Sequence, residues 1–173
     1  MSGLDRLNNF DAGEALEYLQ HCCGSISWAH QMVMSRPFVD RESLLGLSDR
    51  LWEDLPFEDR LDAFDTNPRL GNLSYEDTSL AGTWMREERT TIEAMPEEVL
   101  DDLKSRQLQY ENKFGFTFVA DARNKSTVEI NHELDRRMLN DVETEVAIAS
   151  EQQRKLIWRR LESLLLLLAA SKH

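Results

Sequence analysis

One polar side chain stands in a stretch that is built like a catalytic loop. Asn67 lies within FDTNPRLGN, residues 64–72, where Pro68 and a following glycine indicate a helix end that turns into an ordered loop. Such a loop holds a side chain at a fixed place. An asparagine donates and accepts hydrogen bonds there but does not exchange protons. The residues alone leave open whether Asn67 is a turn residue or an altered catalytic position.

A glutamate in a charged run is a second candidate. Glu88 follows Trp84 by four residues in WMREER, so the two side chains share one face of a helix. A run of charges is usually a solvated face. If Trp84 packs inward, however, Glu88 is drawn toward the interior, where a carboxylate could orient a proton-transfer partner or take a proton itself.

An arginine near the C-terminus is a third candidate. Arg160 lies four residues from both Leu156 and Leu164, at or beside the apolar stripe of the last helix. A cation there either extends to water or meets an anion. It could cover the edge of the core, or its planar donors could bind a carboxylate ligand.

Other kinds of site find little support. The four histidines are scattered without metal-ligand spacing, so no metal site is predicted. The sequence also lacks a phosphate-binding glycine loop and a GxSxG elbow. Cys22 and Cys23 are adjacent and indicate reduced, buried thiols. A catalytic cysteine remains an alternative without an identifiable partner.

Composition narrows the class of partner and the compartment. A net charge of −12 argues against nucleic acid but allows a small anion held by one or two arginines. The apolar run at 164–170 is too short to cross a bilayer, and the first residues do not form a signal peptide. We therefore expect a cytoplasmic protein without a membrane segment. The ending Ser171-Lys172-His173 is similar to a peroxisomal address, which normally ends in leucine, so a peroxisomal location is the alternative.

The hydrophobic pattern predicts an all-α fold: one domain over residues 1–173, a compact bundle of about seven to nine helices. Asp11 and Ser25 are expected N-caps, and Gly115 is expected to break a helix. Phe116, Phe118 and Val119 suggest a short extended segment after it. The expected helices cover residues 11–22, the stretch from 25 to about 36, 41–53, 57–66, 76–93, 97–113 and 141–169.

Five stretches in order resemble one enzyme family, 2-oxo-4-hydroxy-4-carboxy-5-ureidoimidazoline (OHCU) decarboxylase. The resemblance extends from about residue 10 to 168 and rests on HCCGSISWAHQMVMSRPF (21–38), FEDRLDAFDTNPRLGN (57–72), WMREERTT (84–91), YENKFGFTFVADARNKST (110–127) and EVAIASEQQRKLIWRRLESLL (145–165). It implies a carboxy-lyase of urate catabolism that yields (S)-allantoin. It also implies a homodimer that uses no metal or organic cofactor.

The resemblance also implies site residues. Glu88 matches the catalytic glutamate, and Arg160 matches the arginine expected to hold substrate. Asn67 stands where the family has its catalytic histidine, and Arg89 stands where it has glutamine. The remaining residues expected to bind substrate or shape its pocket are Pro68, Trp84, Phe118, Val119, Ala120 and Arg123.

The departure at Asn67 admits three interpretations. It is a substitution made to trap ligand, or a natural variant that uses Glu88 and Arg89 differently or acts on a related substrate. Alternatively, it marks a relative that binds a ureidoimidazoline-like ligand or a protein partner without catalysis. A helical adaptor that uses the charge run as its contact surface is a further alternative.

Overall fold

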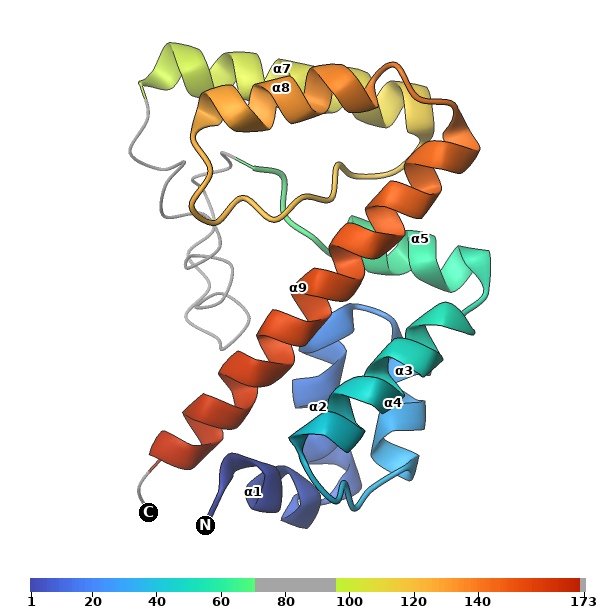
Figure 1. Ribbon diagram of the computed structural model, residues 1–173, viewed down its shortest axis with the longest axis vertical. Helices are drawn as coiled ribbons and strands as arrows, with labels where there is room; N and C mark the ends of the chain where they lie inside the picture. Colours follow the sequence, from blue (N-terminus) through green and yellow to red (C-terminus); the bar gives the residue numbers. More distant parts are fainter. Residues whose placement is uncertain (71–95, 172–173) are drawn as a thin grey trace. The chain divides into compact units, whose positions relative to one another are not determined.

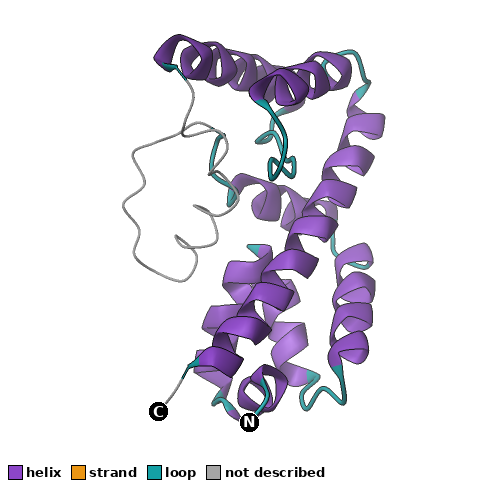
Figure 2. Ribbon diagram, turned by 60° about the vertical axis from the view of Figure 1, so that its left-hand side comes forward, coloured by secondary structure: helices purple, strands orange, loops and turns teal. Residues whose placement is uncertain are grey.

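The computed structural model describes residues 1–70 and 96–171, and the described chain is helical (Figure 1). It contains no β-strand within these ranges (Figure 2), so the all-α prediction is confirmed. The helices are α1 (Gly3–Asn9), α2 (Ala12–Cys23), α3 (Ile26–Met34), α4 (Arg41–Glu53), α5 (Phe57–Asp65), α7 (Glu97–Phe114), α8 (Thr127–Arg137) and α9 (Val142–Ala170).

The chain divides into two compact units. The first comprises Met1–Ala63 and Arg154–His173, and the second comprises Phe64–Gln153. The boundaries fall near the end of α5 and within α9. Each unit is described by itself below, and the expectation of one domain over the whole chain stays a prediction.

The first unit packs short helices around a tryptophan. Trp28 of α3 is fully buried, and its indole N–H donates to the carbonyl of Ser48 in α4 at 3.2 Å. The predicted caps are present, because Asp11 accepts from the N–H of Glu14 and Ser25 accepts from that of Trp28. These caps satisfy backbone donors at the starts of α2 and α3 that would otherwise lack partners.

The second unit is built on α7 and α8, which lie side by side in both views (Figures 1 and 2). Tyr110 contacts the rings of Phe114, Phe116 and Phe118 at centroid distances of 4.7, 5.8 and 5.1 Å. Gly115 ends α7 with φ 82°, a conformation that side chains other than glycine rarely adopt. The chain then runs without regular structure to α8, and this segment carries several predicted site residues.

Two helices were missed by the sequence reasoning. Both α1 and α8 begin with a capping box, in which Ser2 pairs with Asp5 and Ser126 pairs with Glu129. The capping boxes are local start signals that could have revealed both helices, and in α8 the buried Ile130 and Leu134 also recur at helical spacing.

The hydrophobic pattern also predicts Val142 as the first residue of the apolar stripe on α9, and this prediction is wrong. Val142 is 53% exposed, whereas Glu145, three residues later, is fully buried. The buried face of α9 therefore includes charged and amide side chains along with leucines.

The helix predicted over residues 76–93 lies outside the described residues. Within the described ranges, no helix combines the length and the apolar character needed to cross a membrane.

Candidate functional site

Asn67 lies just past the end of α5 and is buried, with only 8% of its surface exposed. Its side-chain amide donates to the Phe64 carbonyl at 3.1 Å and to Oε1 of Gln153 at 2.6 Å. Its backbone N–H also donates to the Phe64 carbonyl, at 3.1 Å. The side chain is therefore held inside the second unit and not turned out as in an ordinary surface turn.

The loop that carries Asn67 is fixed on its far side by α7. The buried side chain of Gln107 accepts from the N–H of Leu70 and donates to its carbonyl, both at 2.8 Å. Arg69 makes two parallel bonds to Glu111, of 2.8 and 2.6 Å. The Glu111 carboxylate raises the pKa of Arg69. Pro68 is half-buried and lies between Asn67 on one side and Arg69 and Leu70 on the other, so the loop is attached both before and after it.

The predicted pocket wall is a buried, non-helical segment. Phe118, Val119 and Ala120 are 2%, 1% and 9% exposed. Just before them, the Asp65 carboxylate accepts from the N–H and the hydroxyl of Thr117 at 3.0 and 3.1 Å. Just after them, Gln152 of α9 accepts from the N–H of Asp121 at 3.3 Å. Side chains of two helices thus hold both ends of the wall.

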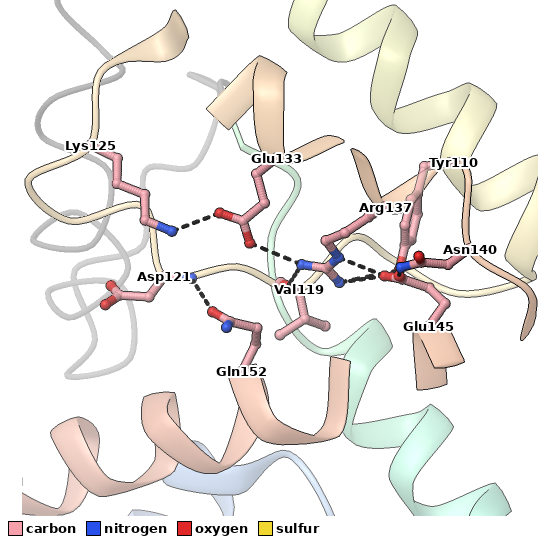
Figure 3. Close-up of polar contacts among 9 residues, drawn as sticks. All are labelled: Tyr110, Val119, Asp121, Lys125, Glu133, Arg137, Asn140, Glu145 and Gln152. Atoms are coloured by element: carbon pink, nitrogen blue, oxygen red, sulfur yellow. Dashed lines mark hydrogen bonds and ion pairs between the residues drawn. The ribbon is translucent and has the colours of Figure 1, made fainter. Parts of the chain in front are cut away.

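The middle of the wall is held by a buried arginine of α8 (Figure 3). Arg137 donates from Nη1 to the carbonyl of Val119 at 2.7 Å, and its guanidinium carbon lies 4.4 Å from the centroid of the Phe118 ring. The same guanidinium pairs with Oε1 of Glu145 at 2.6 Å and with Oε1 of Glu133 at 3.3 Å. The two carboxylates are balanced by this guanidinium together with Lys125, which pairs with the other oxygen of Glu133 at 2.7 Å.

Tyr110 completes this cluster. Its hydroxyl donates a short hydrogen bond to Glu145 and accepts from Nη2 of Arg137 at 3.3 Å. Burial raises the pKa of the Tyr110 phenol far above its ordinary value, so the hydroxyl keeps its proton and acts as a donor. Asn140 donates to the second oxygen of Glu145 at 2.9 Å. Both oxygens of a fully buried carboxylate are thereby satisfied.

The turn after the wall is tied to α8 and to itself. Lys125 pairs with Glu133 at 2.7 Å. Arg123 is half-buried, its backbone N–H donates to Asp121 at 3.3 Å, and its Nε lies 3.8 Å from the same carboxylate. Nε of Arg123 is buried and forms no hydrogen bond within the described part of the chain.

Arg160 belongs to the first unit. It is 5% exposed, and its Nη1 lies 3.4 Å from the carbonyl of Cys22. This burial rules out an arginine that covers the edge of the core and extends to water. Burial also raises the pKa of the neighbouring Cys23 thiol to about 12, so Cys23 stays protonated at neutral pH. That protonation argues against Cys23 as a nucleophile.

The predicted site residues therefore fall into three groups. Asn67, Pro68, Phe118, Val119, Ala120 and Arg123 lie in the second unit, and Arg160 lies in the first. Trp84, Glu88 and Arg89 lie outside the described residues. No cluster of three or more His, Cys, Asp or Glu side chains that could hold a metal occurs among the described residues.

Sequence reasoning missed Gln153, Glu145 and Arg137. The signal that singled out Arg160 was also present at the first two, since Glu145 and Gln153 lie four residues before and after the buried Ala149 on α9. A polar residue in an apolar stripe predicts a buried partner. Arg137 carried the same signal, three residues after the buried Leu134, but it was not used because α8 itself was missed.

Comparisons with known proteins agree on one family. The model of the OHCU decarboxylase family matches residues 8–162. The chain is 29% identical over 145 residues to "Uric acid degradation bifunctional protein TTL" of Arabidopsis thaliana, a match that covers 83% of this chain and 45% of that protein. It is 26% identical over 166 residues to "Uric acid degradation bifunctional protein" of Bacillus sp. (strain TB-90), covering 95% and 32%. The chain thus spans less than half the length of these two curated relatives.

Two crystal structures share its fold. One is OHCU decarboxylase in the presence of (S)-allantoin, with a TM-score of 0.74 and 27% identity over 87% of this chain and 97% of that one. The other is (S)-allantoin synthase, with a TM-score of 0.68 over 94% and 54%. At 18% identity, this second likeness concerns the fold alone. The expected family is confirmed.

Proposed function

Because the chain belongs to the OHCU decarboxylase family, we propose that it decarboxylates OHCU to (S)-allantoin, at a rate limited by Asn67. The observation that carries this proposal is the likeness to a crystal structure of OHCU decarboxylase in the presence of (S)-allantoin, which matches over 97% of its length. The family relatives named for uric acid degradation support the same reaction.

The chemistry assigns a task to each proposed residue. Breaking the bond between the ring carbon and the carboxylate releases carbon dioxide and leaves the electron pair on that carbon as an enolate-like intermediate. Arg160 is proposed to hold a substrate oxygen through charge-assisted hydrogen bonds. Glu88 is proposed to orient or transfer the proton that must then be added to one face of that carbon. Asn67 is proposed to lie beside the carbon that takes up the negative charge, at the place where a hydrogen-bond donor or acid would stabilise it.

Asn67 has a limited share in this mechanism, because an amide does not titrate. Its amide nitrogen already donates to Gln153 and to the Phe64 carbonyl. The same observation favours a second candidate, a relative that binds the ureidoimidazoline ring or its product without turnover. The wall segment, Arg123 and Arg89 are proposed ligand contacts under either function, and Pro68 and Trp84 are proposed to shape the pocket.

The two candidates separate in one experiment. OHCU is generated in situ from urate, and its disappearance and the optical activity of the allantoin are followed with and without the protein. We expect faster disappearance and an excess of (S)-allantoin. Binding of (S)-allantoin without any acceleration supports the non-catalytic candidate, and the absence of both contradicts the proposed function.

We propose a homodimer as the assembly of this chain, on the strength of the family resemblance. Light scattering coupled to gel filtration is expected to give about twice the 20.1 kDa of one chain. A mass equal to one chain at micromolar concentration contradicts the dimer.

We propose a cytoplasmic location, in keeping with the two free, buried cysteines. A fluorescent protein fused to the N-terminus leaves Ser171-Lys172-His173 free to act as an address. A diffuse signal is expected, and a punctate signal that coincides with a peroxisomal marker contradicts this location.

A further inference from the structure

We propose that Arg137 is a positioning residue that fixes the main chain of residues 118–120 for ligand binding; this inference rests on the proposed function. Arg137 contacts two consecutive residues of the wall. It donates to the carbonyl of Val119 at 2.7 Å, and its guanidinium lies 4.4 Å from the centre of the Phe118 ring. Because Arg137 contacts both the Val119 carbonyl oxygen and the neighbouring Phe118 ring, it fixes the orientation of the peptide between Val119 and Ala120.

The orientation matters because of the next amide. The peptide between Val119 and Ala120 is trans, since among the described residues only the Arg36–Pro37 bond is cis. In a planar trans peptide, the C=O and N–H bonds point in opposite directions. With the Val119 oxygen turned to Arg137, the N–H of Ala120 points away from Arg137.

The N–H of Ala120 is one of three consecutive backbone donors for which no acceptor occurs among the described residues. Nothing within the described ranges accepts from the backbone N–H of Phe118, Val119 or Ala120. The three residues are nevertheless buried. Because a buried N–H group without an acceptor is costly, the wall is suited to donate to oxygen atoms of a bound molecule. The carbonyl and carboxylate oxygens of a ureidoimidazoline are acceptors of this kind.

Arg137 is itself held from several sides. Its guanidinium meets Glu145, Glu133 and the hydroxyl of Tyr110 (Figure 3). These partners come from α9, α8 and α7. An arginine serves this purpose better than a lysine, because its planar fork reaches several acceptors at fixed angles.

The charge balance distinguishes Arg137 from a residue that binds ligand directly. Glu145 is fully buried and Glu133 is 9% exposed, and these two carboxylates offset the two cations that contact them, Arg137 and Lys125. Arg137 therefore adds no net positive charge for an anionic ligand. Its contribution to binding is the geometry of the wall.

The test uses the full chain with two variants and a control. In the double variant Arg137→Met/Glu145→Gln, the contact with Val119 is lost without leaving the Glu145 charge buried alone. Arg137→Lys keeps the charge but cannot reach all the acceptors at once. The control, Arg106→Met, removes a partly exposed arginine of α7 that pairs with Asp102 and Asp135 in the same unit.

Two measurements are made on each folded variant. Amide hydrogen exchange by NMR is expected to accelerate at Phe118, Val119 and Ala120 in the double variant and to stay unchanged in the control. KM for OHCU, or Kd for (S)-allantoin, is expected to rise about tenfold in the double variant and by less in Arg137→Lys, since small misplacements of binding groups cost up to about 100-fold. A purely structural role would lower the folded fraction and the apparent kcat while KM stays constant.

The outcomes also separate this inference from the proposed function. If the natural chain binds and turns over ligand, and the folded double variant keeps the same KM and exchange rates, Arg137 does not position the wall. If the natural chain shows neither turnover nor binding, the proposed function fails. In that case the exchange rates at residues 118–120 still decide whether Arg137 holds the segment, and unchanged rates overturn the inference. Should the double variant not fold, Arg137→Lys serves for both measurements.

Discussion

The exchange of Asn67 for histidine is the sharpest single test of the catalytic interpretation. In Asn67→His, one ring N–H can donate to Oε1 of Gln153, which now accepts from the Asn67 amide at 2.6 Å. That bond would orient the imidazole and leave its other nitrogen to exchange a proton near neutral pH. The buried amide of Gln153 thus provides a ready partner for a histidine at this position.

The expected magnitude follows from two opposing effects. A positioned acid or base contributes about 10²- to 10⁴-fold in rate, or about 3–5.5 kcal/mol of barrier. Against this, Asn67 is only 8% exposed, so a larger ring crowds its site and costs about 1–3 kcal/mol of stability. Such a loss leaves a domain of ordinary stability folded. The gain in rate therefore dominates, and we expect kcat to rise about 100-fold or more.

The assay follows OHCU produced in situ from urate, with circular dichroism reporting the excess of (S)-allantoin. Thermal unfolding of each variant establishes that equal amounts of folded protein are compared. The matched control is Asn67→His/Gln153→Leu, which keeps the imidazole and removes its acceptor. We expect this control to lose most of the gain, because an unoriented imidazole is a poor acid or base. A folded Asn67→His variant no faster than the natural chain refutes the assignment of position 67 to proton exchange.

Two further predictions concern stability. Replacing Gln107 with leucine strands the N–H and carbonyl of Leu70, so urea unfolding is expected to show a loss of about 2–4 kcal/mol; an unchanged midpoint would mean that the loop is not held by this side chain. The raised pKa of Cys23, about 12 against an ordinary 9.0, means that the unfolded chain ionises first as pH rises. Stability from this thiol is full below about pH 9 and falls above it by up to about 1.4 kcal/mol per pH unit. Urea unfolding at pH 8 and 10.5 should show a larger loss of stability in the natural chain than in Cys23→Ala, which keeps only the smaller loss from Tyr110, whose pKa is also raised. Equal losses in the two proteins would contradict this.

The helices were largely predictable because their start and stop signals are local. Asp11, Ser25 and Gly115 each act on the few residues around them, and the structure places all three at helix ends. The α4 helix begins and ends where its hydrophobic pattern predicted. The two missed helices also carried local signals, because Ser2 and Ser126 each begin a capping box.

The site was less predictable because it depends on contacts between distant parts of the chain. Gln153 lies 86 residues from Asn67, and Arg137 reaches the Val119 carbonyl 18 residues away. A sequence pattern can mark a polar residue as buried, as it did for Arg160, but it does not name the partner. The family resemblance identified position 67 as that of the catalytic histidine. The contact with Gln153, which the sequence does not reveal, explains how an amide is accommodated there.

The buried cluster of Tyr110, Glu133, Arg137 and Glu145 has an evolutionary consequence. Each of the four side chains is a hydrogen-bond or ion-pair partner of another, in a place from which water is largely excluded. The loss of one therefore leaves buried polar groups without partners, which destabilises the protein. We expect selection to remove single substitutions at these four positions. Related proteins should either keep all four residues or replace several of them together. Substitutions in this protein are therefore expected to be rare at these four positions and to accumulate at exposed positions such as Leu139, which is 86% exposed.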